Sequence, residues 1–400
     1  MKKVVWFCVL ACCLIMSGCT QQETNSIEQK PIVEQRKPCI VSFINIGKGD
    51  AFLIDVPDDG YYLCDTGKEQ DFATIARVLA LKKVTHINGI FLSHGHLDHT
   101  GNVENLLKNY TVDKIYISDQ EDPSYRKFPI REVVSAYDTE LVELHSNQHL
   151  QFHDLGIDVW IPSSIDKKNE NNNSVVMKMT YGMNSILMTG DMELEEEAAF
   201  LFENKNLQCD ILKLGHHGEK DATSIALLDR VKPKYGIITG NAKENPQSVN
   251  KTITQRLEQF QVNPFYSDGD QICIDFVSTK DKIKIRYVYD QKVQSNVGIE
   301  EFNIDEGYVL LKNKGTEAVN ISNYHIRSKK GEEWFTIPKG TILKSGEVLY
   351  IKEADCDYDG KPSILWNQED VWDDDEKEAA VLYDSNYAKI DKKEGVNTYE

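Results

Sequence analysis

The run Ser93-His94-Gly95-His96-Leu97-Asp98-His99-Thr100 is the feature that most constrains the fold of this chain. A strand presents every second side chain on one face, so His94 and His96 can converge on one metal ion. A helix that starts at about Asp98 would turn Asp98 and His99 toward a second ion. Imidazole and carboxylate ligands suit zinc, manganese or iron. The alternative is a histidine-rich surface loop, which has to be weighed because the chain holds ten histidines.

The segment before this run argues against a surface loop. Residues 90–92 are a short apolar stretch, as expected of a buried strand, and they lead directly into Ser93. Metal ligands at the end of a buried strand have the structural context that a metal centre needs. Two adjacent ions can activate water and bind a phosphoryl or acyl group. The sequence therefore predicts a metal centre after this strand.

The start of the chain has a different character. A basic N-terminus precedes an apolar run over residues 4–16, which is too short to span a bilayer comfortably, and small residues lead to Cys19. This arrangement resembles the lipobox of bacterial lipoproteins, and an ordinary cleaved signal peptide is the alternative. We expect residues 1–19 to be a lipoprotein signal peptide, Cys19 to be lipidated and residues 20–37 to be a polar tether. The protein would then be secreted and lipid-anchored to the outer face of the bacterial cytoplasmic membrane.

The formal net charge of −19 limits the classes of partner. A surface this acidic repels nucleic acid and anionic lipid at long range, so a nucleic-acid substrate would have to be held locally by metal ions and a few basic side chains. The nine cysteines show neither the spacing of a disulfide framework nor a zinc-finger pattern.

Strand-like and helix-like segments alternate from Cys39 onward, which predicts sheets covered by helices. After about residue 292 the helical periodicity disappears and short strands alternate with turns, as in a β-sandwich. We therefore expect domains over residues 38–291 and 298–396. Strands are expected at 40–44, 51–56, 61–64, 114–117, 157–161, 174–179, 185–188, 211–214 and 235–238, and helices at 193–204, 222–230 and 248–260.

Six motifs follow one another along residues 39–290. Besides the histidine run they are Ile-Gly-Lys-Gly-Asp-Ala at 46–51, Leu-Cys-Asp-Thr-Gly at 63–67, Asn-Asn-Ser-Val-Val at 172–176, Leu-Met-Thr-Gly-Asp at 187–191 and Asp-Ile-Leu-Lys-Leu-Gly-His-His-Gly at 210–218. In this order they resemble the metallo-β-lactamase superfamily, and within it the branch related to the hydrolase domain of the ComEC DNA-uptake proteins. The resemblance implies an α/β fold, the αββα metallo-β-lactamase sandwich.

Residues from about 300 to 396 resemble, less specifically, a bacterial lamin-tail domain. The matching segments are 308–313, 335–340 and 370–372, the last followed by Ala-Val-Leu-Tyr-Asp at 380–384. This resemblance implies an all-β immunoglobulin-like sandwich after the first domain. An unrelated sandwich with similar turns is the alternative.

The superfamily resemblance also implies roles for individual residues. It implies two divalent ions, zinc with manganese as the alternative, with Asp191 as the bridging carboxylate. His216 would complete the ligands of the second ion, with His217 as the alternative, and Asp65 would orient a ligand by a hydrogen bond. A helix N-cap is the other interpretation of Asp191. The expected metal ligands are His94, His96, Asp98, His99, Asp191 and His216, with Asp98 and Asp191 as the catalytic pair.

Four residues are candidates for binding a substrate phosphate, although ordinary turn and helix-start roles suit them equally well: Lys48, Lys220, Thr223 and Ser224. Two departures from the branch stand out. Asn245-Pro246-Gln247 stand where His-Pro-His is usual, and Glu219 stands where serine is usual. Both departures weaken the case for a polyanionic substrate.

The expected function is that of an extracytoplasmic binuclear metallohydrolase, a phosphodiesterase or nuclease in which a metal-bound hydroxide attacks nucleic acid or another phosphodiester. One alternative is a hydrolase of small phosphoesters or lactones. Another is a non-catalytic surface-binding lipoprotein that acts through its C-terminal domain, whose protein partner the sequence does not identify.

Overall fold

The computed structural model describes residues 37–120, 129–243, 245–329, 333–354, 356, 359–369, 371–372 and 378–395. The expected signal peptide, the lipidated Cys19 and the expected tether as far as residue 36 lie outside these residues. Among the helices in the described ranges, none is long and apolar enough to cross a membrane.

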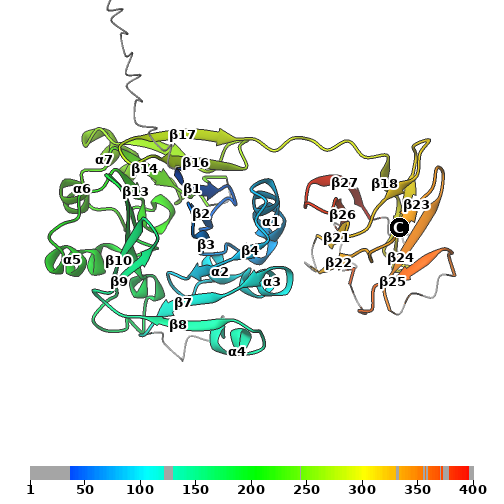
Figure 1. The fold of residues 1–400 in the computed structure, drawn as a ribbon, viewed down its shortest axis with the longest axis horizontal. Helices are drawn as coiled ribbons and strands as arrows, with labels where there is room; N and C mark the ends of the chain where they lie inside the picture. Colours follow the sequence, from blue (N-terminus) through cyan, green and yellow to red (C-terminus); the bar gives the residue numbers. More distant parts are fainter. Residues whose placement is uncertain are drawn as a thin grey trace, which may run out of the picture. The chain divides into compact units, whose positions relative to one another are not determined.

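Two mixed sheets pack face to face in the first part of the chain (Figure 1). The first sheet has eight strands in the order β17-β16-β1-β2-β3-β5-β7-β8. Its strands are β1 (Cys39–Ile44), β2 (Phe52–Val56), β3 (Gly60–Cys64), β5 (Gly89–Phe91), β7 (Lys114–Ser118), β8 (Glu140–Leu144), β16 (Cys273–Ser278) and β17 (Ile283–Val288).

The second sheet has seven strands in the order β15-β14-β13-β12-β11-β10-β9. Its strands are β9 (His149–Phe152), β10 (Leu155–Trp160), β11 (Val176–Tyr181), β12 (Asn184–Met188), β13 (Ile211–Lys213), β14 (Tyr235–Ile238) and β15 (Asn263–Tyr266). A separate pair is formed by β4 (His86–Ile87) and β6 (Thr111–Val112).

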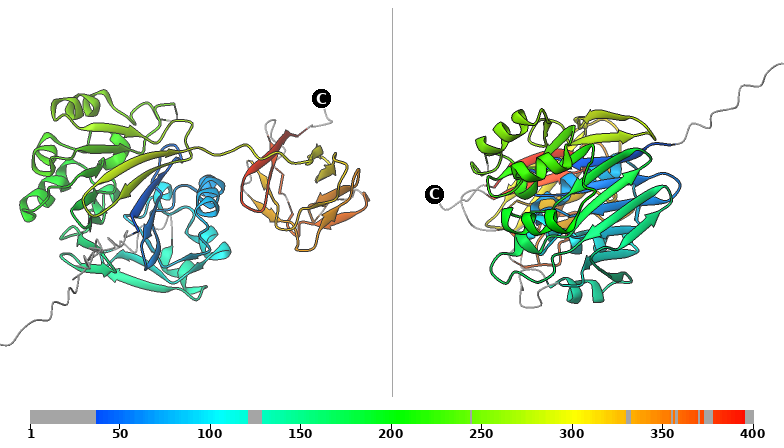
Figure 2. Two further views of the ribbon diagram at one scale, coloured as in Figure 1. Left: turned by 45° about the horizontal axis from the view of Figure 1, so that its top comes forward. Right: turned by 90° about the vertical axis from the view of Figure 1, so that its left-hand side faces the viewer.

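Helices cover the outer face of each sheet, as the two views in Figure 2 also show. The first sheet carries α1 (Phe72–Leu81), α2 (Leu97–Thr100), α3 (Val103–Asn109) and α4 (Ile130–Ser135). The second carries α5 (Leu194–Glu203), α6 (Ile225–Val231) and α7 (Lys251–Gln259). Short 3-10 helices are η1 (Glu69–Asp71), η2 (Glu170–Asn173) and η3 (Gly215–Gly218).

Alternation along the strands explains the layers. In β2, Phe52 and Ile54 belong to the core between the two sheets, whereas Leu53 belongs to the core beneath the helices of the first sheet. Successive side chains of a strand point to opposite faces, so a strand buried on both faces is apolar throughout. Met177 and Met188 bring the second sheet into the same central core. The predicted αββα fold class is therefore confirmed.

The C-terminal part is an all-β sandwich, as expected. Its sheets have the orders β18-β19-β24-β25 and β22-β21-β26-β27, with a further pair β20-β23. One apolar core joins Val309 and Leu311 of one sheet to Ile326 and Leu382 of the other. The strands are β18 (Val297–Asn303), β19 (Tyr308–Asn313), β20 (Val319–Asn320), β21 (His325–Ser328), β22 (Trp334–Thr336), β23 (Ile342–Leu343), β24 (Val348–Lys352), β25 (Ser363–Leu365), β26 (Ala379–Tyr383) and β27 (Lys389–Glu394).

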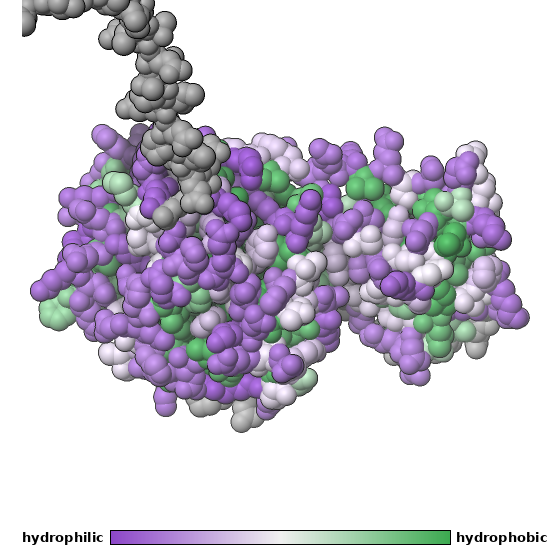
Figure 3. All heavy atoms as spheres, in the orientation of Figure 1, coloured by the Kyte–Doolittle hydropathy of each residue, from purple (hydrophilic) through white to green (hydrophobic). Residues whose placement is uncertain are grey.

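The surface and the cysteines agree with the sequence analysis. Hydrophilic side chains cover most of the face drawn in Figure 3, as the net charge of −19 predicts. The five cysteines of the described ranges are free thiols, and four of them are buried: Cys39, Cys64, Cys209 and Cys273.

Parallel strands place the loops of the site together. β3 pairs with β5 in the first sheet, and β12 pairs with β13 in the second, both in parallel. Asp65, Ser93, Asp191 and His216 each follow the carboxyl end of one of these strands. Ligand sites of α/β proteins form at such ends because the loops after parallel strands meet there.

Candidate metal centre

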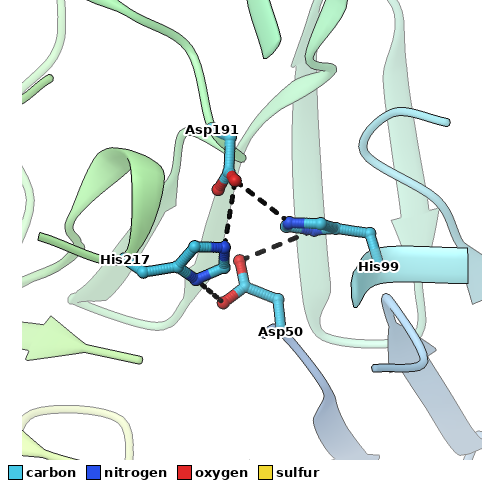
Figure 4. A group of neighbouring side chains, drawn as sticks. All are labelled: Asp50, His99, Asp191 and His217. Atoms are coloured by element: carbon cyan, nitrogen blue, oxygen red, sulfur yellow. Dashed lines mark hydrogen bonds and ion pairs between the residues drawn. The ribbon is translucent and has the colours of Figure 1, made fainter. Parts of the chain in front are cut away.

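Four buried side chains from four separate loops converge at this edge of the sheets (Figure 4). Asp50 follows the turn between β1 and β2, His99 lies in α2, Asp191 follows β12, and His217 lies in η3. One ligand atom from each lies within 4.8 Å of the others. We call Asp50, His99, Asp191 and His217 the buried cluster.

Asp191 contacts both imidazoles of the buried cluster. Its Oδ2 lies 3.0 Å from His217 Nε2 and 3.2 Å from His99 Nε2. On the other side of His217, Nδ1 lies 3.5 Å from Asp50 Oδ1. Asp191 is not a helix N-cap, because Glu193 occupies the N-cap position of α5. The backbone N–H of Asp191 donates to Ser174 Oγ at 3.0 Å, which holds the loop in place.

The other residues of the histidine run border the buried cluster. Asp98 Oδ2 lies 3.4 Å from His217 Nε2. The His94 ring is centred 4.2 Å from that of His99, and His94 Nε2 lies 2.9 Å from His96 Nδ1. The structure thus brings His94, His96, Asp98, His99 and Asp191 together.

His216 lies elsewhere, in a second and more exposed group. His216 Nδ1 is 3.0 Å from Asp221 Oδ1 and 3.8 Å from Glu193 Oε1. We call Glu193, His216 and Asp221 the outer cluster. His217, the alternative left open by the sequence, is the imidazole that lies in the buried cluster.

The turn that separates the two imidazoles is strained. His216 has φ 47° and His217 has φ 52°, so two consecutive residues with side chains occupy the left-handed region. Such conformations are uncommon outside glycine and persist where the surrounding structure enforces them. Here the two left-handed conformations direct the side chain of His216 into the outer cluster and that of His217 into the buried cluster.

Asp65 holds His99 in one orientation, as the sequence analysis expected. Asp65 Oδ2 lies 2.8 Å from His99 Nδ1, and Asp65 Oδ1 accepts the Ser93 backbone N–H at 2.8 Å. A carboxylate on one ring nitrogen directs the other nitrogen toward a metal. His99 Nε2 is therefore the atom that faces Asp191.

Two members of the centre were missed by the sequence analysis. Asp50 was quoted only as part of a turn motif, although an acidic side chain at the start of a buried strand is itself a signal. Lys213 was also missed, although it interrupts the apolar stretch of β13. Its buried ammonium contacts a carboxylate oxygen of Asp50, donates to Gly190 O at 3.0 Å, and lies 3.4 Å from Asp191 Oδ1.

The expected substrate-binding residues are dispersed. Lys48 Nζ lies 3.0 Å from Glu219 Oε1. Thr223 Oγ1 accepts the Gly215 backbone N–H at 3.1 Å, and Ser224 caps α6 by accepting the Leu227 N–H at 3.0 Å. Lys220 is exposed. Thr223 and Ser224 therefore have structural roles, whereas Lys48 and Lys220 lie in the two loops that supply Asp50 and His217 to the buried cluster.

Charge is concentrated in the buried cluster. Burial lowers the pKa of His217, but the carboxylates of Asp191 and Asp50 outweigh burial and raise it to about 10. Burial raises the pKa of Asp98, but the imidazoles of His217 and His99 outweigh it and hold the pKa well below its usual range. The carboxylates that hold a proton on His217 would equally favour a metal cation in its place.

The side chains of the buried cluster and of the histidine run are suited to binding metal ions. His217 Nε2 and both carboxylate oxygens of Asp50 are buried without a hydrogen bond of acceptable geometry. Buried polar atoms are rarely left unpaired unless an ion or a ligand binds them. Asp98, His99, Asp191 and His217 would hold one ion, with Asp50 beside it. His94 and His96 would hold the second, which Asp191 could share.

Comparisons with known proteins identify a family for each part of the chain. The model of the metallo-beta-lactamase superfamily matches residues 44–239, and that of the Lamin Tail Domain matches residues 277–395. The second match begins within the β16–β17 hairpin of the first sheet.

Two curated relatives match the first part of the chain. ComE operon protein 3 of Bacillus subtilis (strain 168) is 27% identical over 58% of this chain and 33% of its own length. Recombination protein 2 of Haemophilus influenzae is 25% identical over 55% of this chain and 26% of its own length. The chain thus spans a third or less of these relatives.

The metallo-beta-lactamase fold protein YhfI from Bacillus subtilis aligns with a TM-score of 0.42 at 15% identity, over 57% of this chain and 96% of that protein.

Proposed function

Because this chain contains a metallo-β-lactamase domain and a lamin tail domain, we propose that it is a metal-dependent phosphodiesterase that cleaves nucleic acid or another phosphodiester. The observation that carries this proposal is the convergence of Asp50, His99, Asp191 and His217 from four loops into one buried cluster. A purely structural role does not require so many ionisable groups to be buried together.

The chemistry follows from the types of residue present. Two divalent cations would supply Lewis-acid activation of water and of a phosphoryl oxygen. We propose zinc, because imidazole and carboxylate ligands suit it, with manganese as the alternative. The side chains of the buried cluster are imidazoles and carboxylates, so no serine or cysteine nucleophile is implied. Asp65 and Ser93 keep His99 in one tautomer, and Lys213 holds the second oxygen of Asp191 away from His217.

Nucleic acid is the proposed substrate because of the relatives. The name of one relative, Recombination protein 2, refers to recombination, and that of a further relative, competence protein ComA of Neisseria gonorrhoeae, refers to competence. Phosphodiester hydrolysis is a reaction that a pair of cations performs by an in-line displacement.

A second candidate, a hydrolase of small phosphoesters, is favoured by a specific contact. Lys48, which stands two residues before Asp50 of the buried cluster, is paired with Glu219. A polyanion would meet this carboxylate as well as Glu193 and Asp221 of the outer cluster. A small monoanionic ester would meet less repulsion.

The test uses purified, metal-replete protein and a panel of substrates: single-stranded and duplex DNA, RNA, bis(p-nitrophenyl) phosphate, p-nitrophenyl phosphate and a lactone. We expect cleavage of diesters and its loss in Asp191→Ala. Cleavage of the lactone alone would contradict the phosphodiesterase proposal. A protein that binds no metal, and whose properties His96→Ala does not change, would instead support a binding role.

We further propose, from the sequence, that Cys19 is lipidated and tethers the protein to the outer face of the cytoplasmic membrane. Radiolabelled palmitate incorporation in cells, compared with Cys19→Ala, tests this. Equal labelling of both proteins would contradict it.

A further inference from the structure

The two loops that supply Asp50 and His217 to the buried cluster make a second contact, between Lys48 and Glu219. We call this partly exposed pair the rim of the buried cluster. Lys48 precedes Asp50 by two residues, and Glu219 follows His217 by two. Inside, Asp50 Oδ1 lies 3.5 Å from His217 Nδ1; at the rim, Lys48 Nζ lies 3.0 Å from Glu219 Oε1. At the rim, the first loop supplies the base, Lys48, and the second loop supplies the acid, Glu219. In the inner contact the first loop supplies the acid, Asp50, and the second supplies the imidazole, His217.

Lys48 lies directly beside an expected metal ligand. The next residue, Gly49, packs so tightly on Asp98 that a Cβ at this position would lie 3.0 Å from Asp98 O, and its φ of +152° also favours glycine. The Lys48 side chain is about one-fifth exposed, at 20%. A phosphate that approaches Asp98 and His217 therefore comes within reach of this lysine.

Glu219 is held in place by several neighbours. Besides Lys48, its Oε1 accepts a hydrogen bond from Asn245 Nδ2 at 3.2 Å and lies 4.0 Å from His216 Nε2. Asn245 belongs to the first departure from the branch that the sequence resembles, Asn245-Pro246-Gln247, and Glu219 is the second. The structure shows that the two departures form one contact.

Further acidic groups lie near this rim, and Lys220, next to Glu219 in the sequence, is exposed. Glu193 and Asp221 add negative charge next to His216, and Glu170 accepts the backbone N–H of Gly95 at 3.0 Å. Lys213 is fully buried between Asp50 and Asp191 and cannot reach a substrate at the rim.

We propose that Glu219 is a specificity-determining residue of the hydrolytic site: it competes with the substrate phosphate for Lys48 and so weakens the binding of anionic substrates. This inference rests on the proposed function. The Lys48 and Glu219 side chains are 20% and 15% exposed, so a phosphate from solvent can reach Lys48 and offer it another partner. The displaced Glu219 carboxylate then remains close to the bound phosphate and repels it, most strongly when the substrate carries several charges.

The test measures two quantities on the metal-replete full chain: KM for bis(p-nitrophenyl) phosphate, and the Kd of inorganic phosphate by calorimetry. Glu219→Gln keeps the size of the side chain and removes its charge, so it should lower both values by about three- to tenfold. The effect should fall mainly on KM rather than on kcat. With an uncharged p-nitrophenyl ester, KM should stay within about twofold of the wild-type value.

Two further variants separate the competition for Lys48 from a general field effect. The double variant Lys48→Gln/Glu219→Gln should lose the gain in phosphate affinity. Glu193→Gln removes a carboxylate that also faces His216 but bonds Asn171, and it should change the phosphate Kd by less than about twofold. If phosphate binding is not tighter in Glu219→Gln, or if the gain survives the loss of Lys48, the inference is overturned. A wild-type protein that cleaves no diester would refute the proposed function, whereas the phosphate Kd would still decide the role of Glu219.

Discussion

The buried cluster and the outer cluster contain the same types of side chain, supplied in part by adjacent residues of one turn, yet their environments differ. Asp50, His99, Asp191 and His217 are all buried, whereas Glu193, His216 and Asp221 are partly exposed. Burial makes each uncompensated charge costly, so the buried cluster requires counter-charges such as Lys213. In the outer cluster, solvent can screen the same groups. Burial, more than residue type, separates the two clusters, and we propose the buried cluster as the metal centre.

The largest expected effect that tests this comparison comes from replacing His217, with His216 as the matched control. We expect His217→Ala to lose bound metal and to lower hydrolytic activity on the order of a thousandfold, because it removes a ligand from the buried cluster. His216→Ala should retain the wild-type metal content. Elemental analysis of both purified variants makes the measurement. Loss of metal from His216→Ala alone would reverse the assignment.

Lys213→Met tests whether the buried cluster depends on an internal cation. Removing one partner of a buried ion pair costs about 3–5 kcal/mol, because Asp50 and Asp191 are left with uncompensated charge. We expect this loss of unfolding free energy in metal-free protein and a smaller loss with zinc bound, because the ions supply positive charge. Thermal unfolding with and without metal measures the difference. An equal loss in both forms would show that Lys213 contributes packing alone.

Asp65→Asn tests how precisely His99 must be oriented. Asp65 Oδ2 lies 2.8 Å from His99 Nδ1, and a lost carboxylate–histidine contact lowers metal affinity by about 10- to 100-fold. Competition with a chelator measures the affinity. As a control, Asp221→Asn changes the corresponding carboxylate of the outer cluster and should leave metal affinity unchanged.

His325 of the C-terminal sandwich shows what burial does when carboxylates do not surround the imidazole. Its ring stacks on Tyr387 with centroids 4.1 Å apart, and burial lowers its pKa to about 4, against the weaker effect of Asp384. At His217 the effect of the carboxylates exceeds that of burial, so the pKa is raised to about 10.

This difference predicts acid sensitivity in the sandwich. The unfolded imidazole titrates near 6.5 and the folded one near 4, so the contribution of His325 is fully present above pH 6.5 and is lost as the pH falls toward 4. Lowering the pH from 7 to 5 should cost roughly 1–2 kcal/mol of unfolding free energy. Denaturant titrations of the wild type and His325→Leu at both pH values measure it. An unchanged pH dependence in the variant would contradict the assignment.

The smallest expected effect concerns Ser224. The sequence suggested it as a substrate-binding residue, and the structure places it at the start of α6. Ser224→Ala should cost about 1 kcal/mol by removing the cap of α6. Metal content and KM for a diester should not change. A raised KM without loss of stability would restore Ser224 to substrate binding.

Much of the fold was predictable because the elements bury regular apolar patterns. The strand expected at 235–238 is β14 itself, and the helix expected at 193–204 spans Leu194–Glu203. Helix starts were less accurate. α6 and α7 begin later than expected, at Ile225 and Lys251, because the side chains of Ser224 and Asn250 cap them. Local hydrogen bonds, rather than periodicity, decide these boundaries.

The site was less predictable than the fold. His94, His96, Asp98 and His99 stand in one run, so their spacing alone indicates convergence. Asp50 and Lys213 lie far from that run in sequence, and only the pairing of β1 with β2 and of β12 with β13 brings them to it. The choice between His216 and His217 depends on two left-handed backbone angles, which sequence periodicity does not encode.

Anomalous scattering from crystals of zinc- or manganese-loaded protein shows whether the buried cluster binds metal. We expect a strong peak at metal–ligand bonding distance, about 2.0–2.2 Å, from His217 Nε2 and a carboxylate oxygen of Asp191. A peak confined to Glu193, His216 and Asp221, or a buried cluster without any peak at saturating metal, would contradict this expectation.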